Sequence, residues 1–262
     1  MSQVPTVIIT RPPHQAQNLA QGLAQLGRQS LVYPLFEIEA IRDNPELDLA
    51  LQNLATFALV VFVSPNAIDA LFTRVPALAS NWPSALTIGV VGAASRQALL
   101  RHGVDENKVK IVSPSHEERT DSETLLVELD LPALAGRKAL IVRADSGRDF
   151  LTEALRAADV EVQAVTAYKR VTPPFDENRR AQLIDFLQGQ YDWVITSSAA
   201  LRTLLDWCSQ LDRENAVAKM QQQHLFVPHF RIAEVAAELG FKHVSLSASG
   251  DEKLLLALQS HL

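Results

Sequence analysis

The chain has 262 residues, of which 47% are hydrophobic and 21% charged, and its formal net charge is −6. These values are typical of a globular protein with one large domain or two of ordinary size. The negative charge argues against binding nucleic acid or an anionic membrane by bulk electrostatic attraction, and no apolar run reaches the roughly 18 residues of a membrane span.

The first residues run from Met1 directly into the strand-like Val4–Thr10, without the basic and then apolar pattern of a signal peptide. The single cysteine, Cys208, cannot form an internal disulfide, so we expect a cytoplasmic protein in a reducing compartment. The seven histidines form no HExxH motif and no His–Cys cluster, and we therefore expect no metal.

Short apolar runs alternate with segments of helical periodicity along the whole chain. The predicted strands are Val4–Thr10, Ser30–Pro34, Leu59–Ser64, Thr87–Val91, Val109–Val112, Lys138–Arg143, Val162–Ala167, Trp193–Thr196, His224–Val227 and His243–Leu246. Several of these runs are continuously apolar, which is typical of parallel strands covered by helices on both faces.

The segments between the strands predict helices that begin at Ser, Thr or Pro and end before Gly. They are Gln15–Leu26, Ala67–Leu71, Ser95–Arg101, Asp149–Ala157, Ala199–Cys208, Ile232–Leu239 and Asp251–His261. Alternation of strands and helices predicts an α/β fold with parallel sheets.

Ten strands favour two five-stranded sheets and hence two domains. Pro34–Ile41 and Tyr168–Pro174 are predicted to be extended crossings between them. If the crossings pair as an antiparallel ribbon, residues 38–170 form an inserted domain, and residues 1–35 with 173–262 form the outer domain. The sequence permits this arrangement without requiring it.

Five predicted strand-to-helix turns carry small polar residues or arginine. They are Thr10-Arg11-Pro12, Ser64-Pro65-Asn66-Ala67, Gly92-Ala93-Ala94-Ser95, Asp145-Ser146-Gly147-Arg148 and Thr196-Ser197-Ser198-Ala199. In a parallel sheet such turns share one edge, where helix amino termini present N–H donors and partial positive charge to anions. Two such edges facing one another would form a cleft for a large polyanion, with Arg11, Arg143, Arg148 and Arg202 adding bidentate contacts.

A purely structural interpretation of the same turns stays open. Ser and Thr at a helix start are most often caps, each stabilising the fold by about 1 kcal/mol. The arginines would then be solvated or paired with Asp145 or Asp149, at roughly 0–1 kcal/mol each.

Motifs of several enzyme classes are missing from the sequence. It contains no GxGxxG after the first strand, no GxxxxGK[ST] and no GxSxG, which disfavours dinucleotide, P-loop and serine-hydrolase chemistry. Cys208 lies on an apolar helical face and is predicted to be a core residue. Tyr168 remains as a candidate proton donor, since a phenol is protonated at neutral pH; the alternative is a tyrosine packed between domains.

Several motifs together resemble the uroporphyrinogen-III synthase family. They are Ile9-Thr10-Arg11-Pro12, Val61-Phe62-Val63-Ser64-Pro65-Asn66-Ala67, Gly92-x-x-Ser95, Gly136 to Arg143 with Gly147-Arg148-x-x-Leu151, Tyr168-Lys169-Arg170, and Val194-Ile195-Thr196-Ser197-Ser198. Their order and spacing cover nearly the whole chain.

The resemblance implies two flavodoxin-like domains, one inserted into the other and joined by a two-stranded linker. It implies a cofactor-free lyase that cyclises hydroxymethylbilane, with loss of water and inversion of the last pyrrole ring. By the same resemblance Tyr168 assists departure of the hydroxyl. The substrate-binding residues that we predict are Thr10, Arg11, Ser64, Asn66, Ser95, Arg143, Arg148, Ser197, Ser198 and Arg231.

One turn departs from the family pattern, which has Gly-Pro-x-Thr where this chain has Pro228-His229-Phe230-Arg231. Arg231 would replace the missing threonine as a carboxylate partner. Two rival functions stay open: a non-catalytic two-lobed module that binds a small polyanion and, more weakly, a sugar or nucleotide transferase. We expect a monomer, and contact with hydroxymethylbilane synthase stays an open question.

Overall fold

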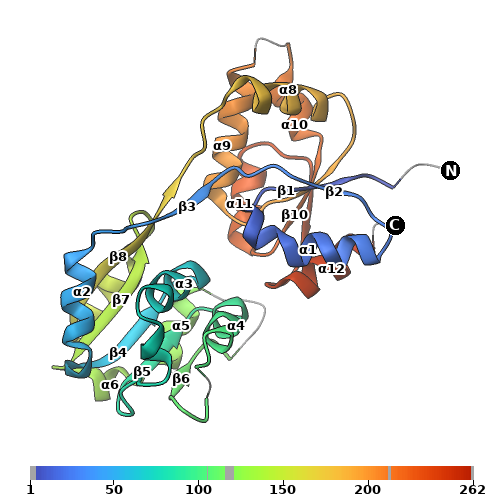
Figure 1. The fold of residues 1–262 in the computed structure, drawn as a ribbon. Helices are drawn as coiled ribbons and strands as arrows, with labels where there is room; N and C mark the ends of the chain where they lie inside the picture. Colours follow the sequence, from blue (N-terminus) through green and yellow to red (C-terminus); the bar gives the residue numbers. More distant parts are fainter. Residues whose placement is uncertain (1–3, 105, 116–120, 212–213, 261–262) are drawn as a thin grey trace. The chain divides into compact units, whose positions relative to one another are not determined.

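The computed structural model describes residues 4–104, 106–115, 121–211 and 214–260 (Figure 1). The chain divides into two compact units, which we call the first unit (Met1–Glu37 and Val171–Leu262) and the second unit (Ile38–Arg170). The second unit is therefore one continuous stretch of sequence, whereas the first is assembled from both ends of the chain.

The first unit is built on a five-stranded parallel sheet in the order β11-β10-β9-β1-β2. Its strands are β1 (Val7–Ile9), β2 (Ser30–Val32), β9 (Asp192–Val194), β10 (His224–Val227) and β11 (His243–Leu246). Counted along the chain this order is 2-1-3-4-5, that of flavodoxin-like folds.

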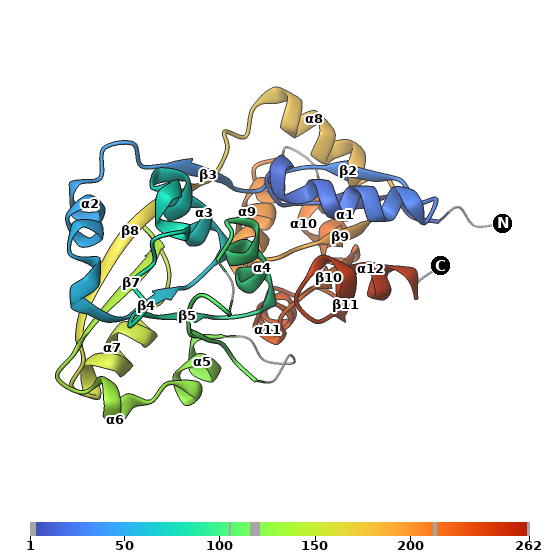
Figure 2. The same ribbon diagram turned by 60° about the horizontal axis from the view of Figure 1, so that its bottom comes forward.

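Helices cover both faces of the first sheet. Helices α1 (Pro13–Gln25) and α12 (Asp251–Gln259) lie side by side and bury Val7, Ile9, Val194 and Phe226 (Figures 1 and 2). On the other face Phe186 of α8 (Glu177–Phe186) packs against Trp193, and Trp207 of α9 (Ser198–Ser209) packs against Tyr33, which also contacts Trp193. Helices α10 (Ala216–Gln221) and α11 (Phe230–Glu238) pack against α9.

The second unit is built on a six-stranded sheet in the order β3-β8-β7-β4-β5-β6. Its strands are β3 (Glu37–Ala40), β4 (Phe57–Phe62), β5 (Thr87–Val90), β6 (Ile111–Val112), β7 (Lys138–Ala144) and β8 (Glu161–Val171). Strands β4 to β8 pair in parallel, and their order along the chain is 3-2-1-4-5, so it differs from that of the first sheet.

Two helical layers also enclose the second sheet. Helices α2 (Pro45–Gln52), α3 (Pro65–Arg74) and α4 (Ala93–Arg101) cover the face that carries Val60, Phe62 and Val142. Helices α5 (Ser122–Glu128), α6 (Leu131–Leu134) and α7 (Phe150–Ala157) cover the face that carries Leu59 and Ile141. Short 3-10 turns at Leu54–Thr56 and Pro76–Ala79 complete the unit.

The predicted α/β fold with parallel sheets is confirmed. The prediction of two five-stranded sheets is wrong for the second unit, because β3, in the segment predicted as a crossing, pairs with β8 at the sheet edge. The predicted strand Val162–Ala167 and the first part of the second crossing, as far as Val171, are likewise one continuous strand, β8.

The predicted helix set was incomplete. It omitted α2, α5, α6, α8 and α10, and the predicted end of the last helix at His261 lies outside the described residues. None of the helices in the described ranges is long and apolar enough to span a membrane.

Candidate functional site

The strand order reverses at one point in each sheet. The reversal lies between β1 and β9 in the first unit and between β4 and β7 in the second. Parallel α/β sheets bind ligands beyond the carboxyl ends of the strands at such a point. Each unit therefore has two of the predicted turns at its switch point: Thr10-Arg11 with Thr196-Ser197, and Ser64-Pro65 with Asp145-Ser146.

Thr10 and Arg11 follow β1, and their side chains bond to different elements. Thr10 is fully buried, and its hydroxyl donates to the carbonyl of Val194 at 2.8 Å, so it joins β1 to β9. Arg11 Nη1 donates to Asp251 Oδ1 at 2.8 Å. The Nε and Nη2 atoms of Arg11 are buried and bond to nothing among the described residues. These two atoms form the side edge of the guanidinium, which can hold a carboxylate with two parallel hydrogen bonds.

Ser197 and Ser198 begin α9 at the same switch point. Ser197 is the N-cap, and its Oγ accepts from the Ala200 N–H at 3.1 Å. Both serines are partly exposed. Arg231 lies on another turn, as the second residue of α11, and is exposed.

Ser64 and Tyr168 are brought together in the second unit from positions 104 residues apart. Ser64 is the N-cap of α3, and its Oγ accepts from the Ala67 N–H at 3.2 Å. Tyr168 lies on β8 with its hydroxyl 2.8 Å from Ser64 Oγ. The tyrosine is only 1% exposed, whereas Ser64 is partly exposed. The pair therefore runs from the core of the second unit to the switch point.

Asn66 and Ser95 lie in the first turns of α3 and α4. Asn66 is partly exposed, next to the cap formed by Ser64. Ser95 is 2% exposed, and its N–H donates to the carbonyl of Gly92 at 3.0 Å. Its burial favours a packing role for the Ser95 side chain.

Arg143 and Arg148 both engage carboxylates of the second unit. Arg143 pairs with Asp149 through Nη1 and donates to the carbonyl of Gly147 through Nη2 at 3.0 Å. Arg148 forms a bidentate pair with Glu123 at 2.6 and 3.0 Å, and this hydrogen bonding raises the pKa of the arginine. Arg143 therefore forms the pair with Asp149 that the purely structural interpretation of these turns predicted.

Acidic residues at helix starts were missing from the predicted site. Asp251 lies in the first turn of α12, Asp149 is the N-cap residue of α7, and Glu123 lies in the first turn of α5. Each pairs with one of the predicted arginines. Because acids are favoured near helix amino termini, their positions could have been inferred; of their pairs with arginine, only that of Asp149 was predicted.

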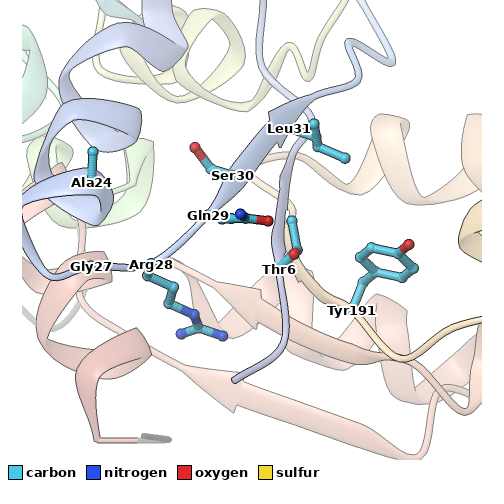
Figure 3. Close-up of a pocket in the computed structure, with 8 residues that line it drawn as sticks. All are labelled: Thr6, Ala24, Gly27, Arg28, Gln29, Ser30, Leu31 and Tyr191. Carbon is cyan, nitrogen blue, oxygen red and sulfur yellow. The ribbon is translucent and has the colours of Figure 1, made fainter. Parts of the chain in front are cut away.

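A pocket of about 710 Å³ lies away from these turns, at the opposite edge of the first sheet (Figure 3). It is lined by Thr6, Ala24, Gly27, Arg28, Gln29, Ser30, Leu31 and Tyr191, which precede or begin β1, β2 and β9. Arg28 is the charged group there, and it bonds to Asp192 and to the carbonyls of Pro5 and Leu258. The lining of this pocket thus offers no unpartnered charge to a ligand.

Among the described residues, neither a reactive thiol nor a group of metal-binding side chains forms part of the site. Cys208 is 1% exposed, and burial raises the pKa of its thiol to about 12, which agrees with its predicted place in the core. No group of three or more His, Cys, Asp or Glu side chains that could hold a metal occurs within the described ranges.

Comparison with known proteins gives consistent results. A family model described as "Uroporphyrinogen-III synthase HemD" matches residues 17–257. The uroporphyrinogen-III synthase of Salmonella typhimurium LT2 is 30% identical over 255 residues, which cover 97% of this chain and 100% of that protein. The corresponding protein of Escherichia coli K12 is 28% identical with the same coverage.

Solved structures show the same fold. A mutant uroporphyrinogen III synthase from the thermophilic bacterium Thermus thermophilus superposes with a TM-score of 0.61 at 16% identity, covering 98% of this chain and 96% of that one. The synthetase from Helicobacter pylori 26695 gives a TM-score of 0.61 at 14% identity, with 98% and 99% covered.

Proposed function

Because the chain belongs to the uroporphyrinogen-III synthase family, we propose that it converts hydroxymethylbilane into uroporphyrinogen III. In this reaction the hydroxyl of the terminal hydroxymethyl group is lost as water, the last pyrrole ring is inverted, and the macrocycle closes. The family match over residues 17–257 is the observation that carries the proposal, and it does not favour a non-catalytic binding module.

We propose that the strand-to-helix turns hold the eight carboxylates of this substrate. Helices α1 and α9 begin at the switch point of the first unit, and α3 and α7 follow the strands at that of the second. The partial positive charge at a helix start and the N–H groups directed out of it suit carboxylates. Binding in this way needs no cofactor.

Arg11 is the side chain best suited to anchor a carboxylate. Asp251 holds Nη1, and the side edge of the guanidinium has no partner among the described residues. A buried donor without a partner costs about 1–3 kcal/mol, so a carboxylate on this edge would relieve that cost. The edge is covered in the structure, and binding therefore requires the covering side chains to move.

Catalysis in this proposal comes mainly from orientation. Holding the flexible bilane with its terminal rings together can lower the barrier by several kcal/mol, within the ~7–11 kcal/mol reached by well-oriented intramolecular reactions. Tyr168, as the source of the proton that the departing hydroxyl takes up, would add about 10²–10⁴-fold.

The isomer ratio of the product tests the proposed function. Purified protein is incubated with hydroxymethylbilane, and the uroporphyrin isomers are separated after oxidation. We expect mainly type III; type I alone, the spontaneous product, would refute the function.

Arg11→Met tests the anchor in the same assay. Loss of a charged hydrogen bond costs about 1.5–3 kcal/mol, so KM should rise roughly 10- to 150-fold. Arg137→Met, at an exposed position just before β7, is the matched control and should leave KM unchanged. Equal KM values for the two variants would remove Arg11 from the binding site.

We further propose that the enzyme acts as a monomer in the cytoplasm. Sedimentation velocity would then give one species near the chain mass of 28.8 kDa. A concentration-dependent dimer would contradict this. The same measurement with added hydroxymethylbilane synthase tests for contact between the two enzymes.

A further inference from the structure

We propose that the Ser64 hydroxyl, and not the phenol of Tyr168, delivers the proton to the departing hydroxyl of the substrate. Tyr168 then supplies the proton that replaces the one donated by Ser64. This inference rests on the proposed function and assigns the group that touches the substrate.

Tyr168 is buried too deeply to meet the substrate itself. The tyrosine is 1% exposed and belongs to the core cluster that includes Phe62, Val142 and Val165. A phenol in this position cannot reach a ligand beyond the sheet edge. Ser64, the hydrogen-bond partner of that phenol, is partly exposed at the turn after β4.

The burial of Tyr168 also fixes the direction of its hydrogen bond to Ser64. Within the described ranges Ser64 Oγ, at 2.8 Å, is the one hydrogen-bond partner of the Tyr168 hydroxyl. If Ser64 donated, the phenol hydrogen would be buried without an acceptor, which is unfavourable. Tyr168 must therefore donate to Ser64.

The Ser64 hydroxyl has one hydrogen left to donate. A serine hydroxyl has two acceptor sites and one hydrogen. One site accepts from the Ala67 N–H at 3.2 Å, and the other accepts from Tyr168. The Ser64 hydrogen therefore remains for a ligand at the switch point. Because hydrogen bonds in a chain polarise one another, accepting two of them makes the Ser64 hydroxyl a better donor.

The resulting step balances in atoms and charge. The carbon–oxygen bond of the hydroxymethyl group breaks, and its electron pair goes to the oxygen, which takes the Ser64 proton and leaves as water. Ser64 takes the proton of Tyr168, which becomes a phenolate. The cation left on the substrate later loses a proton when the macrocycle is complete, and a proton returns to Tyr168 through Ser64.

Two substitutions of Ser64 distinguish proton transfer from helix capping. Ser64→Asn keeps a good N-cap for α3, since Asn is among the preferred cap residues, but it has no hydroxyl to pass a proton. Ser64→Thr keeps both the cap and the hydroxyl. Melting temperatures by circular dichroism verify that both variants fold.

The experiment measures kcat and KM for type III formation in the wild type, Ser64→Asn, Ser64→Thr, Tyr168→Phe and the Ser64→Asn/Tyr168→Phe double variant. General-acid catalysis typically contributes about 10²–10⁴-fold. We expect Ser64→Asn and Tyr168→Phe each to lose activity in kcat by this order, with KM nearly unchanged. Ser64→Thr should stay within a few-fold of the wild type.

The double variant decides the order of the two groups. If the proton passes through both, removing the second group costs nothing more, and the double variant should be no slower than the slower single variant. If the fold-losses in kcat of the two single variants multiplied in the double variant, the relay would be overturned. A wild-type kcat in Ser64→Asn would also overturn it. A wild-type protein that forms only type I would instead overturn the proposed function on which the relay rests.

Discussion

Replacement of Arg28 by methionine should destabilise the first unit strongly. The Arg28 side chain is 1% exposed and pairs with Asp192, whose side chain is 6% exposed. Its Nε donates to the carbonyl of Pro5 at 3.1 Å and its Nη1 to that of Leu258 at 2.8 Å. One guanidinium therefore connects the segment before β1, strand β9 and the end of α12.

The expected cost follows from the buried charge that is left behind. Removing one partner of a buried ion pair typically costs about 3–5 kcal/mol, a large share of the ~5–15 kcal/mol stability of a protein. Each kcal/mol lowers the melting temperature of a domain of this size by roughly 3–5 °C, so we expect a fall of about 10–25 °C.

The tryptophans allow each unit to be followed separately. Trp193 and Trp207 belong to the first unit and Trp82 to the second. In a Trp82→Phe background, fluorescence in a urea titration therefore reports the unfolding of the first unit alone. Arg202→Met, an exposed change on α9, is the control and should shift the midpoint little.

A double variant tests the physical reason. Arg28→Met with Asp192→Leu removes both charges, and replacing a buried pair by apolar residues is often nearly neutral. The double variant should thus be more stable than Arg28→Met. A loss below about 1 kcal/mol in the single variant, or no recovery in the double variant, would refute the reasoning.

Three further predictions concern other parts of the molecule. Cys208 should resist alkylation by iodoacetamide at about pH 8, because the side chain is buried and the pKa of its thiol is raised to about 12. Mass spectrometry would detect the label, and rapid alkylation of the native protein would contradict this prediction. Gly22→Leu should cost roughly 1–3 kcal/mol in thermal melts, since a Cβ there would lie 2.4 Å from Leu255 Cδ1 on α12; Gly22→Ala should cost less. The hydrogen bond from Arg74 lowers the pKa of Asp48. Because the folded pKa is depressed, the pair stabilises the fold above about pH 4, and this contribution is lost as the pH falls through the folded pKa. The stability difference between wild type and Asp48→Asn should therefore shrink between about pH 5 and pH 2, and a constant difference would speak against the pair.

Continuous apolar runs made most of the sheet predictable. Strands such as β4 are buried on both faces, so their sequence is apolar throughout. Strand β3 could not be found in this way, because Glu37–Ala40 lies at a sheet edge with most of its side chains exposed. Helix α8 was missed for a similar reason: only Leu183 and Phe186 are buried, and the rest of its sequence is largely polar.

The site was predictable only in its local part. Ser64 and Ser197 begin helices directly after apolar strands, and both are caps in the structure. The contact between Ser64 and Tyr168 depends on the pairing of β7 with β8, which shifts its register between Arg143 and Ala144. No local pattern encodes such a shift.

The discontinuity of the first unit also sets an order of events during synthesis. Strand β1 pairs with β9 through Val7 and Asp192, so the centre of the first sheet forms only after the chain has been made as far as β9. The second unit is continuous in sequence and is complete once Arg170 has emerged from the ribosome. Residues 38–170 are therefore expected to fold while Val7–Ile9 is still unpaired with β9. During that interval an apolar strand without its partner is the part of the nascent chain most exposed to aggregation or to capture by a chaperone.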